Sequence, residues 1–215
     1  FEHAFNHGHE GQTEDQELIE LRKARQAAML CCLYASLGTV MLHAGDEWGR
    51  SQYGNNNAYC QDNALSWLRW DEADQDQLAL CQKLMRLRNR FHVLLAGTGW
   101  WTSQRVEGSP QTRWLSPSGL DLEVKDWQQA ELRSLALWLC GGPELLLLIN
   151  GHAHALSFRL PSHGLGWECL IDSSNRQTWY TGAGDQPRWV DESISVNAWS
   201  VLWLSPFEAL PDLGA

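Results

Sequence analysis

The sequence predicts two structural parts, a helix-strand-helix segment of α/β type followed by an all-β antiparallel sandwich. Two observations carry this prediction. Helical periodicity is confined to the first part of the chain, whereas the second part holds short β-rich runs separated by Gly, Pro and Ser. We place the boundary between Phe91 and Gly99, which gives predicted domains 1–95 and 96–215.

A long first helix is predicted from Thr13 to Ser36. Thr13 and Gln16 have the spacing of a capping box, and acidic residues follow in the first turn, where the helix dipole favours negative charge. Its second half, Ala27 to Ala35, is apolar almost all round, which is typical of a helix buried on several sides. Gly38 is expected to end it.

A short apolar run, Thr39 to Leu42, has the length of a β-strand, and a long polar loop follows it as far as Asn63. Loops of this length are usually functional or disordered. Amides, carboxylates and aromatic rings together suit a neutral polyhydroxylated ligand, because amides and acids bond hydroxyls directionally and ring faces cover C–H patches. The alternative is that the asparagines fold the loop on itself through Asx turns.

A second helix is expected from a capping Asp74 to about Arg90. Its apolar residues form one stripe that is typical of core packing, namely Leu80, Leu84, Leu87 and Phe91. Beyond it, seven runs are predicted as strands: Thr112–Leu115, Ser134–Cys140, Glu144–Asn150, Ala155–Leu160, Trp167–Asp172, Ser193–Val196 and Trp199–Leu204. Gly141, Gly142 and Pro143 are predicted to form a hairpin turn.

Composition excludes several classes of function. The net charge of −10 over 215 residues argues against nucleic acid and against an anionic membrane surface as partners. No apolar run is long enough to span a bilayer. The six cysteines form no CxxC pair, and no acid or cysteine cluster completes a metal site with His3, His7 and His9, so we expect neither a metal nor a cofactor. Most of the 13 tryptophans are expected in the core, with two or three open to a sugar-stacking role.

Two stretches carry a resemblance to a known family. The run from Gly38 to Trp70, with the consecutive residues GNNNAYCQDN and then SWLRW, resembles the end of the eighth barrel strand in bacterial glycogen debranching enzymes, which are isoamylase-type members of the α-amylase superfamily. Residues 6–25 are similar to the segment of that family that leads into the helix before the eighth strand. Val40 stands where the family usually has proline, and His43 where an aliphatic residue is common, which indicates a divergent member. Beyond Phe91 the resemblance rests on the order of the elements.

The resemblance implies the last helix-strand-helix portion of a (β/α)8 barrel followed by a C-terminal β-sandwich. It implies a parent protein that hydrolyses α-1,6 branch linkages of glycogen-like glucans with retention, which requires two carboxyl groups flanking the bond. In the family those groups come from strands that precede this stretch, so we assign no catalytic residue and expect a fragment that is inactive alone. Expected partners are glycogen or branched maltooligosaccharides and the missing N-terminal part of the barrel; the expected compartment is the cytoplasm.

Nine residues are the candidates for substrate binding at the rim of the cleft: Asp46, Glu47, Trp48, Asn55, Asn56, Asn57, Tyr59, Asp62 and Asn63. Asp46 and Glu47 are adjacent acids, but neighbours on an extended chain point to opposite faces and do not flank one bond. A supporting or sugar-contact role is therefore expected for this pair, and an architectural role stays open for the others.

Two further functions compete with a debranching fragment, namely a glucan-binding module that does not cut and a purely structural domain. An isolated strand with two helices cannot close a barrel. The apolar residues Val40 and Met41 and the stripe around Leu84 are therefore expected to be covered by the missing barrel, by the sandwich or by a second copy of the chain.

Overall fold

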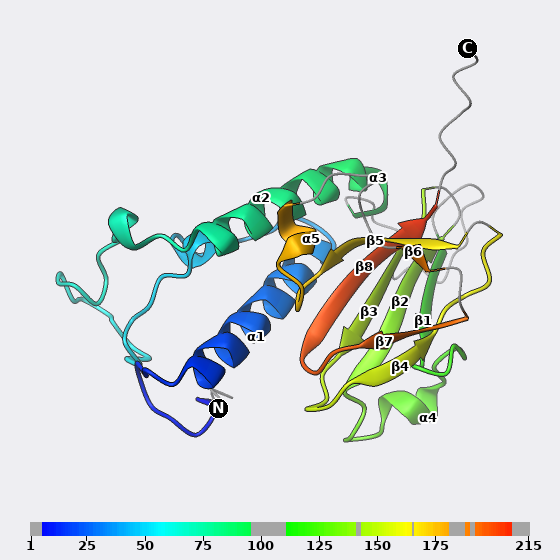
Figure 1. Ribbon diagram of the computed structural model, residues 1–215, viewed down its shortest axis with the longest axis horizontal. Coiled ribbons are helices and arrows are strands. Elements are labelled where there is room, and N and C mark those ends of the chain that lie inside the picture. Colours follow the sequence, from blue (N-terminus) through cyan, green and yellow to red (C-terminus); the bar gives the residue numbers. More distant parts are fainter. Residues whose placement is uncertain are drawn as a thin grey trace, which may run out of the picture.

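A computed structural model describes residues 6–95, 111–140, 143–164, 166–180, 188–189 and 192–207. The helices are α1 (Gln16–Ala35), α2 (Gln75–Arg90), α3 (His92–Leu95), α4 (Val124–Trp127) and α5 (Gln177–Tyr180), with 3-10 turns η1 (Asp46–Trp48) and η2 (Trp70–Glu72). The strands are β1 (Gln111–Leu115), β2 (Ser134–Cys140), β3 (Leu145–Asn150), β4 (Leu156–Arg159), β5 (Trp167–Asp172), β6 (Arg188–Trp189), β7 (Ser193–Val196) and β8 (Ser200–Pro206). The long helices α1 and α2 lie beside the sheets (Figure 1).

The strands form a six-stranded sheet in the order β1-β2-β3-β8-β5-β6 and a two-stranded sheet of β4 and β7. Every pairing between the described strands is antiparallel. The seven runs predicted as strands are therefore confirmed, with ends that shift by at most two residues. The short strand β6 was not predicted. β2 and β3 pair as a hairpin requires, although Gly141 and Gly142 of the predicted turn lie outside the described residues.

Two buried clusters organise the core. One lies between the two sheets and contains Leu146 and Leu148 from β3, Phe158 from β4, and Ile194 and Val196 from β7. Alternation along β3 sends Leu145 and Leu147 to the opposite face of the six-stranded sheet. Because both faces of β3 are covered, this strand reads as a continuous run of leucines rather than as an alternating pattern.

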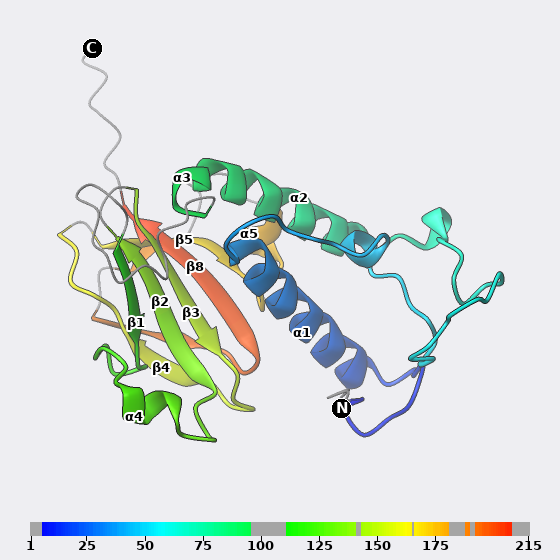
Figure 2. The ribbon, with the colours of Figure 1, turned by 180° about the vertical axis from the view of Figure 1, so that it is seen from behind.

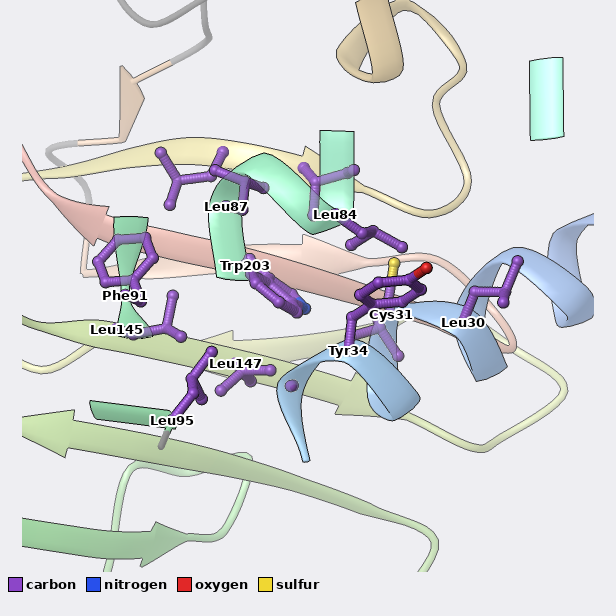
Figure 3. Packing of buried hydrophobic residues seen from close by; sticks show 14 of the residues in the cluster. Leu30, Cys31, Tyr34, Leu84, Leu87, Phe91, Leu95, Leu145, Leu147 and Trp203 are labelled. Atoms are coloured by element: carbon purple, nitrogen blue, oxygen red, sulfur yellow. The ribbon is translucent and has the colours of Figure 1, made fainter. Parts of the chain in front are cut away.

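The second cluster lies between the helices and the six-stranded sheet. Leu30, Cys31 and Tyr34 of α1 and Leu84 and Leu87 of α2 meet Trp203 of β8 there (Figure 3). The predicted apolar stripe of α2 is thus confirmed as core, and its cover is α1 and the sheet. The helical and β parts share this cluster, and the predicted domain boundary at 95/96 stays a prediction.

The start of α1 differs from the prediction. Asp15 is the N-cap, because its side chain accepts hydrogen bonds from the backbone N–H of Glu17 (3.0 Å) and Leu18 (3.3 Å). The Thr13 hydroxyl instead accepts from the N–H of Asp15 at 3.1 Å, so Thr13 and Gln16 do not form a capping box. The Asp15 carboxylate thus accepts from the free N–H groups of the first turn, and a carboxylate is a stronger acceptor than a hydroxyl group.

The strand predicted at Thr39 to Leu42 is also wrong, since this segment has no strand partner among the described residues. Its side chains still alternate as in a strand: Val40 and Leu42 pack against the helix-side cluster, whereas Met41 is 85% exposed. A segment with this alternation becomes a strand only when a neighbour supplies hydrogen bonds. The apolar pattern therefore identified the buried face correctly but not the pairing.

The helix α2 begins as predicted, with Asp74 as its N-cap. The Asp74 carboxylate accepts from the N–H groups of Asp76 (3.0 Å) and Gln77 (3.1 Å) and pairs with Lys23 Nζ at 2.8 Å. Partial burial opposes the charged form, but the hydrogen bonds from Lys23, Gln77 and Asp76 prevail and lower the pKa of Asp74 below 3.8.

We expect Asp74→Ala to lower the free energy of unfolding by about 1–2 kcal/mol, since an N-cap is lost. The folded-state pKa is depressed, so this stabilisation is present above 3.8 and is lost as the pH falls through the folded-state value. Urea denaturation at neutral and acid pH measures both. Asp74→Asn keeps the cap and should lose less; an equal loss in the two variants would contradict the capping role.

Candidate functional site

The chain turns sharply at the start of the long loop. Gly45 (φ 98°) and Gly49 (φ 80°) flank η1 in the left-handed region that favours glycine. A Cβ on Gly45 would also lie 2.6 Å from the Arg50 side chain. The start of α2 holds this turn, because Gln77 Nε2 donates to the Asp46 carbonyl (2.5 Å) and the Asp74 N–H donates to the Trp48 carbonyl (3.0 Å).

Asp46 and Glu47 therefore lie on a 3-10 turn rather than on an extended strand. Both are half-buried. The Glu47 carboxylate accepts from the backbone N–H of Gly45 at 2.8 Å, which ties it to the turn. This placement favours a supporting role for Glu47 in the loop.

Trp48 is buried, and its ring lies against Trp70 of η2 with the centroids 4.1 Å apart. This contact holds Trp48, at the start of the loop, next to Trp70, which follows the loop. Trp70 itself is largely exposed.

Three of the candidate asparagines make local turns. The side-chain oxygen of Asn55 accepts from the N–H of Asn57 (2.8 Å), that of Asn57 from Tyr59 (3.2 Å), and that of Asn63 from Leu65 (3.0 Å). The Asx turns considered as an alternative thus exist. Asn56, Asn57, Tyr59, Asp62 and Asn63 are nevertheless exposed, and Asn55 is half-buried. Their part of the loop extends away from both sheets (Figures 1 and 2).

Two adjoining cavities lie at the base of the loop. A groove of about 850 Å³ runs between the N-terminal segment, α1 and the start of α2, with Arg22, Lys23, Asp74 and Gln77 in its wall. A smaller pocket of about 210 Å³ lies beside it. Gln12, Gly49 and Ser51 line both cavities.

The smaller pocket is aromatic and polar. Its lining includes Trp48, Tyr53, Trp67, Arg50, Arg69 and Glu72. Of the nine candidates from the sequence, Trp48 alone lines either cavity, and the asparagines at 55–57 and 63 do not. The other pocket residues were missed. Tyr53 in the loop and Trp67 just after it could have been recognised from the sequence as aromatic residues near the candidates. No local sequence pattern indicates that Gln12, which precedes α1, belongs to the same pocket.

No group of three or more His, Cys, Asp or Glu side chains suited to a metal occurs among the described residues. His9 Nε2 lies 2.8 Å from the Gln12 carbonyl. Burial, Arg25 and Arg22 lower the pKa of His7, whose Nε2 lies 3.3 Å from Arg25. His3 lies outside the described residues.

No helix in the described ranges has the length and apolar character needed to cross a membrane.

Comparison with solved structures defines the class of fold. The chain resembles a pullulanase from Anoxybacillus sp. LM18-11, solved in complex with maltotetraose, with a TM-score of 0.61 and 16% identity over 91% of this chain and 24% of that one. The chain thus shares its fold with part of this pullulanase. No family model matches the chain.

Sequence relatives are more specific. The chain is 44% identical to the glycogen debranching enzyme of Dickeya chrysanthemi over 158 residues, which cover 74% of this chain and 23% of that enzyme. It is 47% identical to the glycogen debranching enzyme of Enterobacter sp. (strain 638) over 126 residues, or 59% and 18% of the two chains. The chain is therefore a homologue of part of the bacterial glycogen debranching enzymes, and spans about a quarter of their length or less in these matches.

Proposed function

We propose that this chain is the C-terminal part of a glycogen debranching enzyme that hydrolyses α-1,6 linkages in glycogen-like glucans with retention. The observation that carries the proposal is the 44% identity over 158 residues to an enzyme of that name. The chain contributes the end of the (β/α)8 barrel and a C-terminal β-sandwich, and the catalytic carboxylates come from the part of the parent that precedes it. No cofactor or metal takes part.

The base of the loop forms one side of the glucan cleft in this proposal. Its groove and pocket combine amide, carboxylate, guanidinium and indole groups, which suit sugar hydroxyls and sugar ring faces. Asp46 and Glu47 support the turn, and the exposed Asn55–Asn63 segment forms the outer rim. Maltotetraose bound to the pullulanase of similar fold supports a glucan as the ligand.

The rest of the barrel is the proposed partner of the exposed helical face. Met29, Met41 and Met85 are largely exposed, and Met85 lines a groove of about 410 Å³ together with Tyr34 of α1, Val40 and residues of α2 and α3. The unpaired segment at Val40 offers a strand edge, and the relatives are about four times longer than the region they share with this chain. Self-association of the chain is the alternative way to cover this face.

A cytoplasmic location belongs to the same proposal. The six cysteines, which all lie in the described part of the chain, form no disulfide bond. Free thiols are typical of reducing compartments.

A chimera tests the proposed function. The matching region of the Dickeya chrysanthemi enzyme is replaced by this chain, and release of linear chains from glycogen is measured by reducing ends. We expect the chimera to cut branch linkages and this chain alone to release nothing. Hydrolysis by the chain alone, or a folded chimera without activity, would contradict the proposal.

A glucan-binding module without a catalytic partner is the second candidate, favoured by the aromatic pocket. It predicts that maltotetraose binds this chain while the chimera stays inactive. A purely structural domain predicts no binding at all.

A further inference from the structure

The small pocket at the base of the loop is a built site rather than a surface irregularity. Its lining comes from segments far apart in sequence: Gln12 before α1, Arg50 and Tyr53 after η1, and Trp67 and Glu72 near η2. Its volume of about 210 Å³ lies below the range of about 300–1,000 Å³ typical of pockets for drug-sized ligands, so it suits a single small ring.

Trp67 lines one wall of the pocket, and a hydrogen bond restricts the orientation of its side chain. Trp67 is 59% exposed, and its indole Nε1 donates to the Asp62 carboxylate at 2.7 Å. Because this hydrogen bond restricts the indole, less conformational entropy is lost when a ligand stacks on it. Trp48 also lines the pocket, and its ring contacts Trp70, which does not line the pocket.

Two arginines and one glutamate line the pocket, and one arginine pairs with the glutamate. Arg69 pairs with Glu72 at 2.7 Å, and the hydrogen bond with Tyr53 and the charge of Glu72 raise the pKa of its guanidinium. Arg50 donates to the neutral side chain of Gln52 at 2.8 Å. The whole chain carries a net charge of −10, which repels anions. Directed hydrogen bonds beside aromatic faces suit a neutral polyol, whose hydroxyl groups can accept from the Arg50 guanidinium.

We propose that this pocket is a subsite for one glucosyl residue of an α-glucan chain, in which Trp67 stacks on the sugar ring and Asp62 is the positioning residue for Trp67. The inference rests on the proposed function, which supplies the glucan. The remaining glucosyl residues of the chain continue into the adjoining groove, since Gln12, Gly49 and Ser51 border both cavities.

Calorimetric titration of this chain with maltotetraose tests the subsite. We expect Trp67→Ala to weaken binding about tenfold, as for a buried aromatic anchor, and Trp67→Phe to weaken it less. Asp62→Ala should weaken binding several-fold, whereas Asp62→Asn, which keeps an acceptor oxygen, should restore it. Trp127→Ala is the matched control, because Trp127 is also about half exposed but lies on α4. The affinity of this variant for maltotetraose should equal that of the parent chain. Near-ultraviolet circular dichroism verifies the fold of each variant.

Three outcomes overturn the subsite: no binding of maltotetraose by the parent chain, unchanged binding by Trp67→Ala, or tighter binding of glucose 1-phosphate than of maltotetraose. Should Trp67→Ala fail to fold, the comparison of Trp67→Phe with the parent and of Asp62→Ala with Asp62→Asn decides instead. An active chimera with unchanged binding by Trp67→Ala rejects the subsite alone, and an inactive chimera with Trp67-dependent binding rejects the debranching function alone.

Discussion

Replacing Trp203 by alanine is expected to lower the free energy of unfolding by roughly 3–5 kcal/mol. Trp203 is fully buried on β8, between its strand neighbours Leu147 and Ile171. Its ring lies where α1 and α2 meet the six-stranded sheet (Figure 3). Truncation removes this contact from both helices and the sheet at once, and two layers of regular structure cannot collapse into the resulting cavity without shifting.

Two variants make the test specific. Trp203 Nε1 is a buried donor without a partner among the described residues, so Trp203→Phe removes an unsatisfied group while keeping a ring, and should cost much less than alanine. Trp127→Ala removes a half-exposed ring that meets Trp114 edge to face, and a loss below about 1.5 kcal/mol is expected. Urea denaturation gives all three values. A loss at Trp203→Ala no larger than that at Trp127→Ala would mean that the helices do not depend on this contact.

Local patterns predicted the elements whose hydrogen bonds or packing are close in sequence. The stripe of Leu80, Leu84 and Leu87 identified α2, and Asp74 identified its first turn. The strand runs were visible because turn residues separate them. The segment at Thr39 to Leu42 failed for the opposite reason, since a strand needs a partner and its composition cannot show whether one is present.

The candidate site was predicted in part and on similar grounds. The loop was recognised from its composition, but the same asparagines serve both turns and ligands, and the structure shows the turns at Asn55, Asn57 and Asn63. The pocket could not be predicted, because it forms only where Gln12 meets the loop near Trp67. A cavity between segments more than fifty residues apart has no signature in either segment.

Lys83 is a buried charge that is expected to affect stability. It lies on α2 with 7% of its surface exposed, and its amino group donates to the Thr178 carbonyl of α5. Burial lowers its pKa from 10.5 to about 8; Cys169 and Glu168 oppose this shift, and Arg86 adds to it. A shift of that size corresponds to about 3 kcal/mol, as an upper limit for the cost of burying the charged form.

The sign of the pH dependence follows from this shift. Below pH 8 both the folded and the unfolded chain hold the proton, and the full cost is present. Between 8 and 10.5 the folded chain has lost the proton and the unfolded chain has not, so Lys83 destabilises less as the pH rises. Above 10.5 the cost is gone.

We therefore expect Lys83→Met to raise the free energy of unfolding by about 1–2 kcal/mol at pH 7, because the charge is replaced by an apolar chain while the Thr178 carbonyl loses one donor. The difference from the parent should shrink between pH 8 and 10.5. Urea denaturation across this range measures it, and subtraction of the parent curve removes the titration of thiols and tyrosines common to both proteins. Lys125→Met, at an exposed lysine paired with Glu123, should change little at any pH. A loss of stability at Lys83→Met that does not vary with pH would show that the hydrogen bond to Thr178 outweighs the cost of burial.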